Sequence, residues 1–344
     1  MVCLRPATAA QVLAVPDAVG SSLAAVATWE NGARLRWLDM DGRGGELAVP
    51  APARAEAMAW VEPCGVVLLG GGKTVHLARG EGAPDCALLG AGPHNVRSAA
   101  GLGPNRLVAI SGGQYLDGVL KRAQVSLWEL APYPRRLGEG IGPAMNPQAL
   151  AVGNLEGRAC VLISVYKSAI LEPVVRLRPW IYRLADRRLV AVWQGSSFSQ
   201  PYVAAGFADI YPQKACDEVC VLEVTRDGRR QITIYQWRGF VMEGIAQSSP
   251  ARFGDTIRQA QGTGGDATPY VWVGGRRGRL VGLGVAQWPQ NSLARLEPRY
   301  QTRQMPRPIA WDIGRSAGKP AAYVLSERGE LLRMPLVTCG EGAL

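Results

Sequence analysis

Histidine is nearly absent from this chain, which narrows the chemistry open to it. The chain of 344 residues contains two histidines, His76 and His94. Few side chains are therefore present that could form a zinc site or a histidine-based catalytic pair. No apolar run approaches the ~20 residues that cross a bilayer, and no segment of helical period is long enough for a stable helix. We therefore expect an all-β protein with no cofactor and no membrane insertion.

Cysteine is also sparse. Seven cysteines in a chain of this length make neither a dense disulfide scaffold nor a paired set, which favours a reducing compartment. Residues 1–5 open directly into a strand-like segment without the pattern of a signal peptide. We expect a cytoplasmic protein, or an extracytoplasmic one if a signal peptide has been removed. Whether Cys3 and Cys339 pair stays open, although free thiols fit the cytoplasm better.

Positive charge is in excess. Lysine and arginine number 38 against 28 aspartates and glutamates, a net charge of +10. Such an excess favours acidic partners if it is clustered. Only five of the basic residues are lysine, and an arginine-rich, alanine-rich chain can also reflect coding bias. Charge alone therefore gives only weak support for nucleic-acid binding.

The clearest unit of the sequence is residues 201–248. It holds four short apolar runs separated by turn residues such as Asp-Gly and Arg-Gly, typical of one antiparallel meander. Similar first runs begin near residues 11, 55, 97, 148, 202, 258 and 308. Their spacing, about 40 to 55 residues, is that of a four-stranded propeller blade.

This period predicts a single seven-bladed β-propeller domain covering residues 1–344. Seven first runs but only six outer runs occur, so we expect the N-terminal strand to complete the last blade, which would leave no open edge. The expected blades are residues 7–50, 54–91, 96–141, 147–195, 201–247, 256–297, and 307–336 with 2–5. A pair of β-sandwiches is the competing architecture and would require a linker near the middle.

Three segments suggest a family. The runs beginning at Val152 (VGNLEGRACVLI), Phe207 (FADIYPQKACDEVCVL) and Trp311 (WDIGRSAGKPAAYVL) resemble the FG-GAP/VCBS repeats of integrin-α-like propellers. The resemblance implies a propeller in which an Asp-rich loop between the first two strands binds calcium. Only the first polar position is kept, as Asn154, Asp209 and Asp312. Calcium needs six to eight oxygen ligands, so we expect no metal at these loops.

Other motifs have simpler explanations. Gly70-Gly71-Gly72-Lys73-Thr74 resembles the end of a phosphate-binding loop, but Val67 stands where its first glycine belongs and a strand follows instead of a helix. A tight turn explains it. The acidic run at residues 39–46 fits a hairpin turn. No particular carboxylate pair is indicated for glycoside hydrolysis.

One set of residues favours a binding function. In a propeller, the turns between second and third strands share a face with the inter-blade connections, and here these segments are rich in arginine. We predict a basic partner-binding face made of Lys121, Arg122, Arg176, Arg178, Arg226, Arg229, Arg230, Arg276, Arg277 and Arg279. The longest of these connections, residues 111–123 and 166–178, add the apolar and aromatic side chains of Tyr115, Leu116, Ile170 and Leu171.

Apolar and aromatic groups within an arginine-rich surface are typical of protein interfaces. We therefore predict a non-catalytic scaffold, or a subunit of a larger assembly, that binds an acidic protein through its basic face. Two alternatives stay open. One is a glycosidase or lyase with carboxylates at the central channel, and the other is a propeller that binds nucleic acid.

Overall fold

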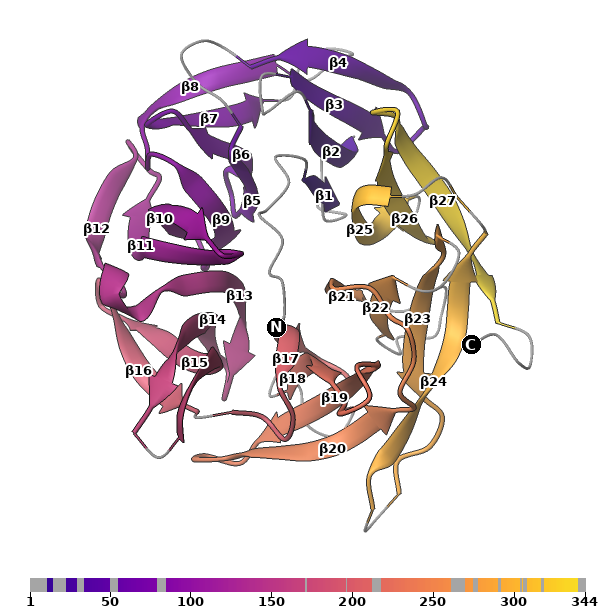
Figure 1. Cartoon of the computed structure of the whole chain (residues 1–344). Coiled ribbons are helices and arrows are strands. Elements are labelled where there is room, and N and C mark those ends of the chain that lie inside the picture. The colour runs from indigo at the N-terminus through magenta and orange to yellow at the C-terminus, as the bar shows by residue number, and fades with distance from the viewer. Residues whose placement is uncertain are drawn as a thin grey trace.

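The computed structural model forms a ring of β-sheets (Figure 1). It describes residues 11–14, 23–29, 34–49, 55–78, 85–170, 172–195, 197–211, 218–260, 270–274, 278–289, 292–303, 305, 308–316 and 319–339. The sheets are arranged radially around a central axis, so the alternative of two stacked sandwiches is excluded. No helix in these ranges is long and apolar enough to cross a membrane.

The first three blades each contain four antiparallel strands. Blade 1 consists of β1 (Val12–Ala14), β2 (Leu23–Trp29), β3 (Arg34–Asp39) and β4 (Gly44–Ala48). Blade 2 consists of β5 (Ala57–Val61), β6 (Gly65–Gly70), β7 (Lys73–Ala78) and β8 (Asp85–Ala91). Blade 3 consists of β9 (Val96–Gly101), β10 (Arg106–Leu116), β11 (Val119–Glu129) and β12 (Arg135–Glu139), and the 3-10 turn η2 (Pro143–Met145) leads to the next blade.

The remaining blades follow the same order. Blade 4 consists of β13 (Pro147–Leu155), β14 (Arg158–Ala169), β15 (Glu172–Ala185) and β16 (Arg188–Gln194). Blade 5 consists of β17 (Tyr202–Ala208), β18 (Glu218–Val224), β19 (Arg230–Trp237) and β20 (Met242–Ser248). Blade 6 consists of β21 (Ile257–Ala260), β22 (Tyr270–Gly274), β23 (Leu280–Val285) and β24 (Ala294–Thr302), and blade 7 consists of β25 (Pro308–Ser316), β26 (Lys319–Ser326) and β27 (Leu331–Thr338).

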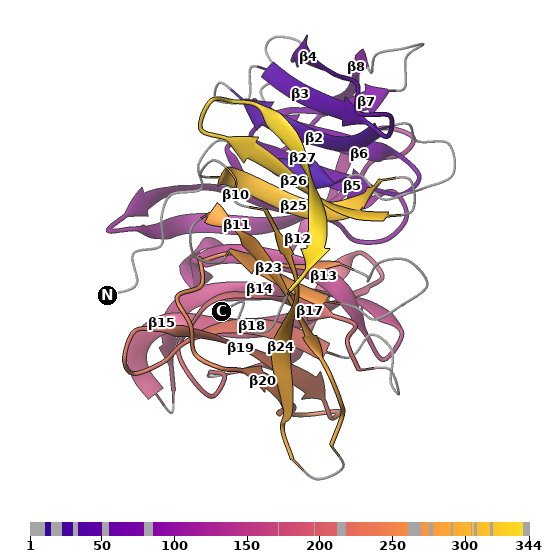
Figure 2. The same cartoon turned by 90° about the vertical axis from the view of Figure 1, so that its right-hand side faces the viewer.

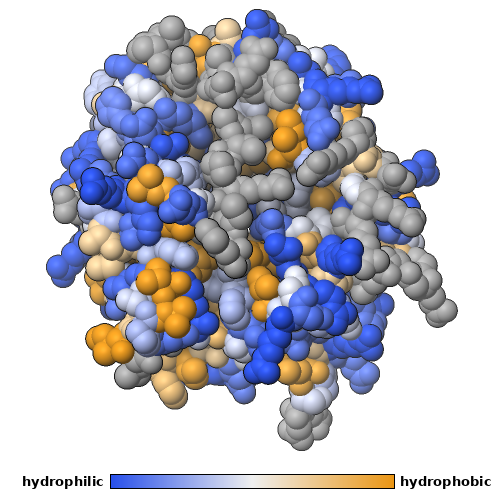
Figure 3. Space-filling model, viewed as in Figure 1, coloured by the Kyte–Doolittle hydropathy of each residue, from blue (hydrophilic) through white to orange (hydrophobic). Residues whose placement is uncertain are grey.

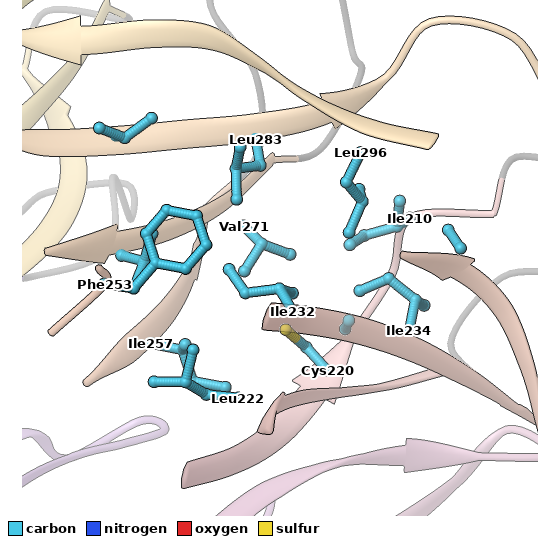
Figure 4. Close-up of a cluster of buried hydrophobic side chains, with 14 of the residues drawn as sticks. Ile210, Cys220, Leu222, Ile232, Ile234, Phe253, Ile257, Val271, Leu283 and Leu296 are labelled. Carbon is cyan, nitrogen blue, oxygen red and sulfur yellow. The ribbon is translucent and has the colours of Figure 1, made fainter. Parts of the chain in front are cut away.

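The hydrophobic core lies between adjacent blades. Figure 4 shows the cluster between blades 5 and 6, where Ile232 and Ile234 of β19 meet Val271 of β22 and Leu283 of β23. All four side chains are fully buried, and burial of each stabilises the fold by about 1.5–3 kcal/mol. The inner strands are covered on both faces, which is why they form almost continuous apolar runs.

The outer edge of blades 5 to 7 is joined by hydrogen bonds. The outer strand β20 pairs in parallel with β24, and the end of β24 (Tyr300 to Thr302) pairs antiparallel with the end of β27 (Leu336 to Thr338). Strand β24 thus covers part of the outer edge of blade 7. The predicted closing strand, residues 2–5, lies outside the described residues.

Candidate functional site: the hairpin face of blades 3 and 4

Two β-hairpins project from one end of the ring (Figure 2). The end that carries the β10–β11 and β14–β15 turns, with the inter-blade connections, is called the hairpin face below and faces the viewer in Figure 1. We predicted residues 111–123 and 166–178 as long connections, and this was wrong. They are extensions of the strands, with pairing that continues to Leu116–Val119 in blade 3 and to Ala169–Glu172 in blade 4.

A local signal explains the first hairpin. Asp117 and Gly118 both have positive φ angles, 52° and 75°, as the two central residues of a type I′ β-turn require. Asp-Gly is among the strongest sequence markers of that turn. It is flanked by the apolar pairs Tyr115-Leu116 and Val119-Leu120, so this hairpin could have been predicted from the sequence alone.

The second hairpin is held by Arg178. This side chain is 1% exposed, although it was predicted to bind a partner, and that prediction is corrected here. Its guanidinium pairs with Glu172 and donates hydrogen bonds to the carbonyl oxygens of Val174 (2.7 Å) and Glu172 (3.1 Å) and, through Nε, to that of Lys167 (3.2 Å). Arg178 therefore ties both strands of the hairpin together.

Glu172 is the acidic partner shared by two arginines. Arg176 also pairs with it, at 2.6 Å. The hydrogen bond from Arg178 and the charges of both guanidinium groups lower the pKa of Glu172 below its usual value. Arg176 is therefore placed on the hairpin as predicted, but its charge is largely matched within the chain.

Cationic groups lie over aromatic rings along both hairpins. The Arg97 guanidinium lies over the Tyr115 ring at 5.8 Å, and the Lys121 ammonium over the Tyr166 ring at 5.1 Å. Lys167 lies over Trp180 at 5.0 Å. Because Lys121 belongs to blade 3 and Tyr166 to blade 4, the second of these pairs links the two blades. Each pair is a cation–π contact of favourable geometry.

Apolar side chains are exposed beside these cations. Leu116 is 48% exposed, Ile170 fully exposed, and Val174 and Val175 are 60% and 50% exposed. Figure 3, which views this face, shows hydrophobic surface on the side of blades 3 and 4. The predicted site residues Tyr115 and Leu116 thus lie on the blade-3 hairpin, and Ile170 lies at the turn of the blade-4 hairpin. Leu171 lies outside the described residues.

A groove of about 940 Å³ opens at the base of the blade-4 hairpin. Its lining comes from the connection between blades 3 and 4, from β14 and β15, and from the end of β16. The side chains that shape it are Ile141, Met145, Lys167, Ile170, Trp180 and Tyr182. The volume is at the upper end of the range for small-ligand pockets.

The other predicted basic residues are more scattered. Arg122 and Arg226 are exposed, whereas Arg229 pairs with Asp227 at 2.6 Å and Arg230 with Asp255. Arg279 donates to Gln301 Oε1 at 3.2 Å. Arg276 and Arg277 lie outside the described residues. Arg122 lies in the blade-3 hairpin, whereas Arg226, Arg229, Arg230 and Arg279 belong to blades 5 and 6.

The opposite end of the ring also carries arginines. The turns between third and fourth strands share that end with the turns between first and second strands. We did not consider the third-to-fourth turns when we predicted the basic face. Arg187 and Arg188, in the β15–β16 turn, are exposed. Arg43 and Arg238, in equivalent positions, pair with Asp41 and Glu243. Basic residues alone therefore do not mark the hairpin face; its combination of cations, aromatic rings and exposed apolar groups does.

Comparison with known proteins identifies the architecture. No protein-family model matches the chain, and no curated protein matches it. Solved structures do match. A chain of the mitotic checkpoint complex is 10% identical with a TM-score of 0.54, and the match covers 96% of this chain and 92% of that chain. BBS1N in complex with ARL6DN is 11% identical with a TM-score of 0.51, and the match covers 99% of this chain and 93% of that chain. A third is virginiamycin B lyase from Staphylococcus aureus, which is 12% identical with a TM-score of 0.51, and the match covers 95% of this chain and 99% of that chain.

The chain is a β-propeller. The all-β fold of four-stranded antiparallel blades predicted from the sequence is confirmed. Identities near one in ten show the fold alone, and one fold carries many functions. The finer resemblance to FG-GAP/VCBS repeats is not shown by any family match. Two of its marker residues, Asn154 and Asp312, lie within strands β13 and β25, although we placed them in loops.

Among the described residues, Glu218 and Glu223, both on β18, are fully buried carboxylates. Glu218 and Glu223 are five residues apart, roughly 17 Å at the rise of a strand, beyond the spacing of a glycosidase pair. Glu218 accepts hydrogen bonds from Ile210 N–H (3.1 Å) and Gln236 Nε2 (3.4 Å). Within the described ranges, no group of three histidine, cysteine or acidic side chains is placed to hold a metal ion.

Proposed function

We propose that this propeller is a non-catalytic scaffold that binds an acidic protein partner through the hairpin face. One observation carries the proposal: the hairpins of blades 3 and 4 present exposed apolar side chains beside Lys121, Arg122 and Lys167. Aromatic and apolar anchors surrounded by cations are characteristic of interfaces that are selective for acidic partners.

Two of the similar structures are of assemblies, BBS1N in complex with ARL6DN and the mitotic checkpoint complex. They support an interaction role for this fold, and the lyase among the matches shows that the fold also supports catalysis. The scaffold proposal therefore depends on the hairpin face and not on the likeness. Membership of the FG-GAP/VCBS family remains part of the proposal.

A capture experiment tests this function. The full chain, immobilised, is used to capture partners from the native source, and the same is done with Arg122→Glu combined with Arg226→Glu. Both residues are exposed on the hairpin face. We expect the double variant to bind the captured acidic protein roughly tenfold more weakly, because two attractive contacts become repulsive.

The matched control combines Arg187→Glu and Arg188→Glu, which make the same charge change at the opposite end of the ring. Equal binding by the hairpin-face variant and the wild type would contradict the proposal. If nucleic acid is retained instead, with affinity that falls steeply as salt is raised, the nucleic-acid alternative is correct.

A further inference from the structure

The groove at the base of the blade-4 hairpin has an unusual charge. Among the described residues, Lys167 and Arg178 are the charged residues that line it, and no acidic residue does. The charge of Arg178 is matched by Glu172. Lys167 Nζ lies 3.6 Å from Met145 Sδ and 5.0 Å from the Trp180 ring. Among the described residues, no carboxylate lies within ion-pair distance of this ammonium group.

This placement favours an acidic occupant. A partly buried ammonium held between a thioether and an aromatic ring has lost some of its hydration, so a carboxylate brought to it gains more than it would at an open surface. Around Lys167 the lining is apolar, through Ile141, Met145 and Ile170. The occupant therefore carries a carboxylate next to a large apolar side chain.

The aromatic rings argue against single-stranded nucleic acid. Bases stack on open ring faces, but Lys167 covers one face of Trp180 and Lys121 covers one face of Tyr166. Tyr182 is 7% exposed. The aliphatic groups Ile141, Met145 and Ile170 offer no stacking surface. An extended peptide fits these features better, because side chains two residues apart point to the same side of it and can place a carboxylate and an apolar group in the groove together.

We propose that this groove binds an extended acidic peptide segment of the partner. An aspartate or glutamate carboxylate pairs with Lys167, and a neighbouring aliphatic or aromatic side chain packs on Ile141, Met145 and the edge of Trp180. The inference rests on the proposed function, since it names the kind of segment by which the acidic partner is held. The exposed side chain of Ile170, at the hairpin tip, forms the rim.

A peptide-selection experiment tests the groove without knowledge of the partner. Random twelve-residue peptides displayed on phage are selected against the immobilised full chain, and enriched peptides are then measured by fluorescence anisotropy. We expect enriched sequences to contain Asp or Glu two residues away from Leu, Ile, Phe or Trp, because side chains at that spacing point to the same side of an extended peptide. Lys167→Glu is expected to weaken their binding at least tenfold, and Ile170→Asp, at a fully exposed position that cannot disturb the core, several-fold.

The control variants separate this inference from the proposed function. Arg187→Glu, at the opposite end of the ring, is expected to leave peptide binding unchanged. Peptides that bind Lys167→Glu and Ile170→Asp as tightly as the wild type overturn the groove assignment. If those peptides are instead lost with Arg122→Glu and Arg226→Glu, the hairpin face still binds acidic partners and only the groove is wrong. Failure to enrich any acidic peptide, or displacement of the peptides by an oligouridylate, also overturns it.

Discussion

At the scale of single residues, blade 5 contains buried charged and polar groups that no sequence motif marks. Glu223 is fully buried and accepts hydrogen bonds from Thr233 Oγ1 (2.6 Å), Tyr235 O–H (2.7 Å) and Ser199 Oγ (2.9 Å). Gln231 Nε2 lies at 3.3 Å. A buried carboxylate with this many hydrogen-bond donors stabilises a fold only while all of these hydrogen bonds are made.

Removing one donor tests this network. Tyr235→Phe deletes the hydroxyl that donates to Glu223 and also accepts from Ser199 N–H. We expect the free energy of unfolding to fall by about 1–3 kcal/mol, measured by chemical denaturation. Tyr182→Phe is the matched control, because its hydroxyl accepts a hydrogen bond from Gln194 Nε2 at 3.1 Å and does not contact a buried carboxylate among the described residues. An equal loss in both variants would mean that the network has no special role.

Glu218 makes stability depend on pH. Burial raises its pKa from 4.5 to about 7, so the folded protein holds this proton more tightly than the unfolded chain does. Its stabilising contribution is therefore complete below pH 4.5 and is lost as the pH rises through 7. We expect Glu218→Gln to remove this dependence, which amounts to at most about 3 kcal/mol.

The measurement is the free energy of unfolding of both proteins at several values between pH 4 and pH 8. The difference between wild type and Glu218→Gln should change across this window, with the wild type losing stability relative to the variant as the pH rises. A buried amide supports this expectation: Gln236 Oε1 has no hydrogen-bond partner, and after an amide flip a protonated Glu218 could donate to it. A constant difference would contradict the assignment.

At the scale of elements, the blade-4 hairpin depends on a side chain inside it. Arg178 joins Lys167 of β14 to Glu172 and Val174 of β15 through backbone carbonyl oxygens. Arg178→Met keeps most of the apolar stem but leaves these carbonyl oxygens without their donor and Glu172 with Arg176 alone. We expect the amides of residues 167–177 to exchange with solvent at least tenfold faster, since a locally lost network costs about 2 kcal/mol or more.

Arg176→Met provides the comparison for this hairpin. Arg176 pairs with the same carboxylate but is partly exposed, so its loss is expected to change exchange only slightly. Hydrogen exchange read by mass spectrometry compares the two variants segment by segment. Equal protection of residues 167–177 in Arg178→Met and the wild type would show that strand pairing alone holds the hairpin.

At the scale of the whole molecule, Asp312 joins three blades near the axis. From β25 of blade 7 it accepts a hydrogen bond from Ala14 N–H of blade 1 at 2.9 Å, and Arg258 of blade 6 lies 3.4 Å away. Gly314 lies so close to Ala14 that an added Cβ would be 2.7 Å from the Ala14 Cβ. Core residues of blades 1 and 7, including Val12 and Tyr323, complete this contact.

Asp312→Ala should therefore loosen the contact between the first and last blades. We expect a melting temperature lower by several degrees and a broader unfolding transition, because Ala14 N–H and Arg258 lose their acceptor. Calorimetry measures both effects. Asp41→Ala, which removes an exposed ion pair with Arg43 in a turn, should leave the melting temperature unchanged, and an equally small effect of Asp312→Ala would contradict a role in ring closure.

The amino-acid sequence by itself determined the type and order of the strands in the described blades, but not the length of the two long hairpins. Runs such as Tyr202–Ala208 and Glu218–Val224 carry the strand pattern locally, and turn residues separate them, so no distant contact was needed to place them. Only the tertiary structure decided which charges face solvent. Arg178 and Arg226 look alike in sequence, yet one is buried in a hairpin and the other exposed, because burial depends on neighbours distant in the chain. The join from β20 through β24 to β27 was likewise decided by the closed ring, which brings outer edges together without any local signal.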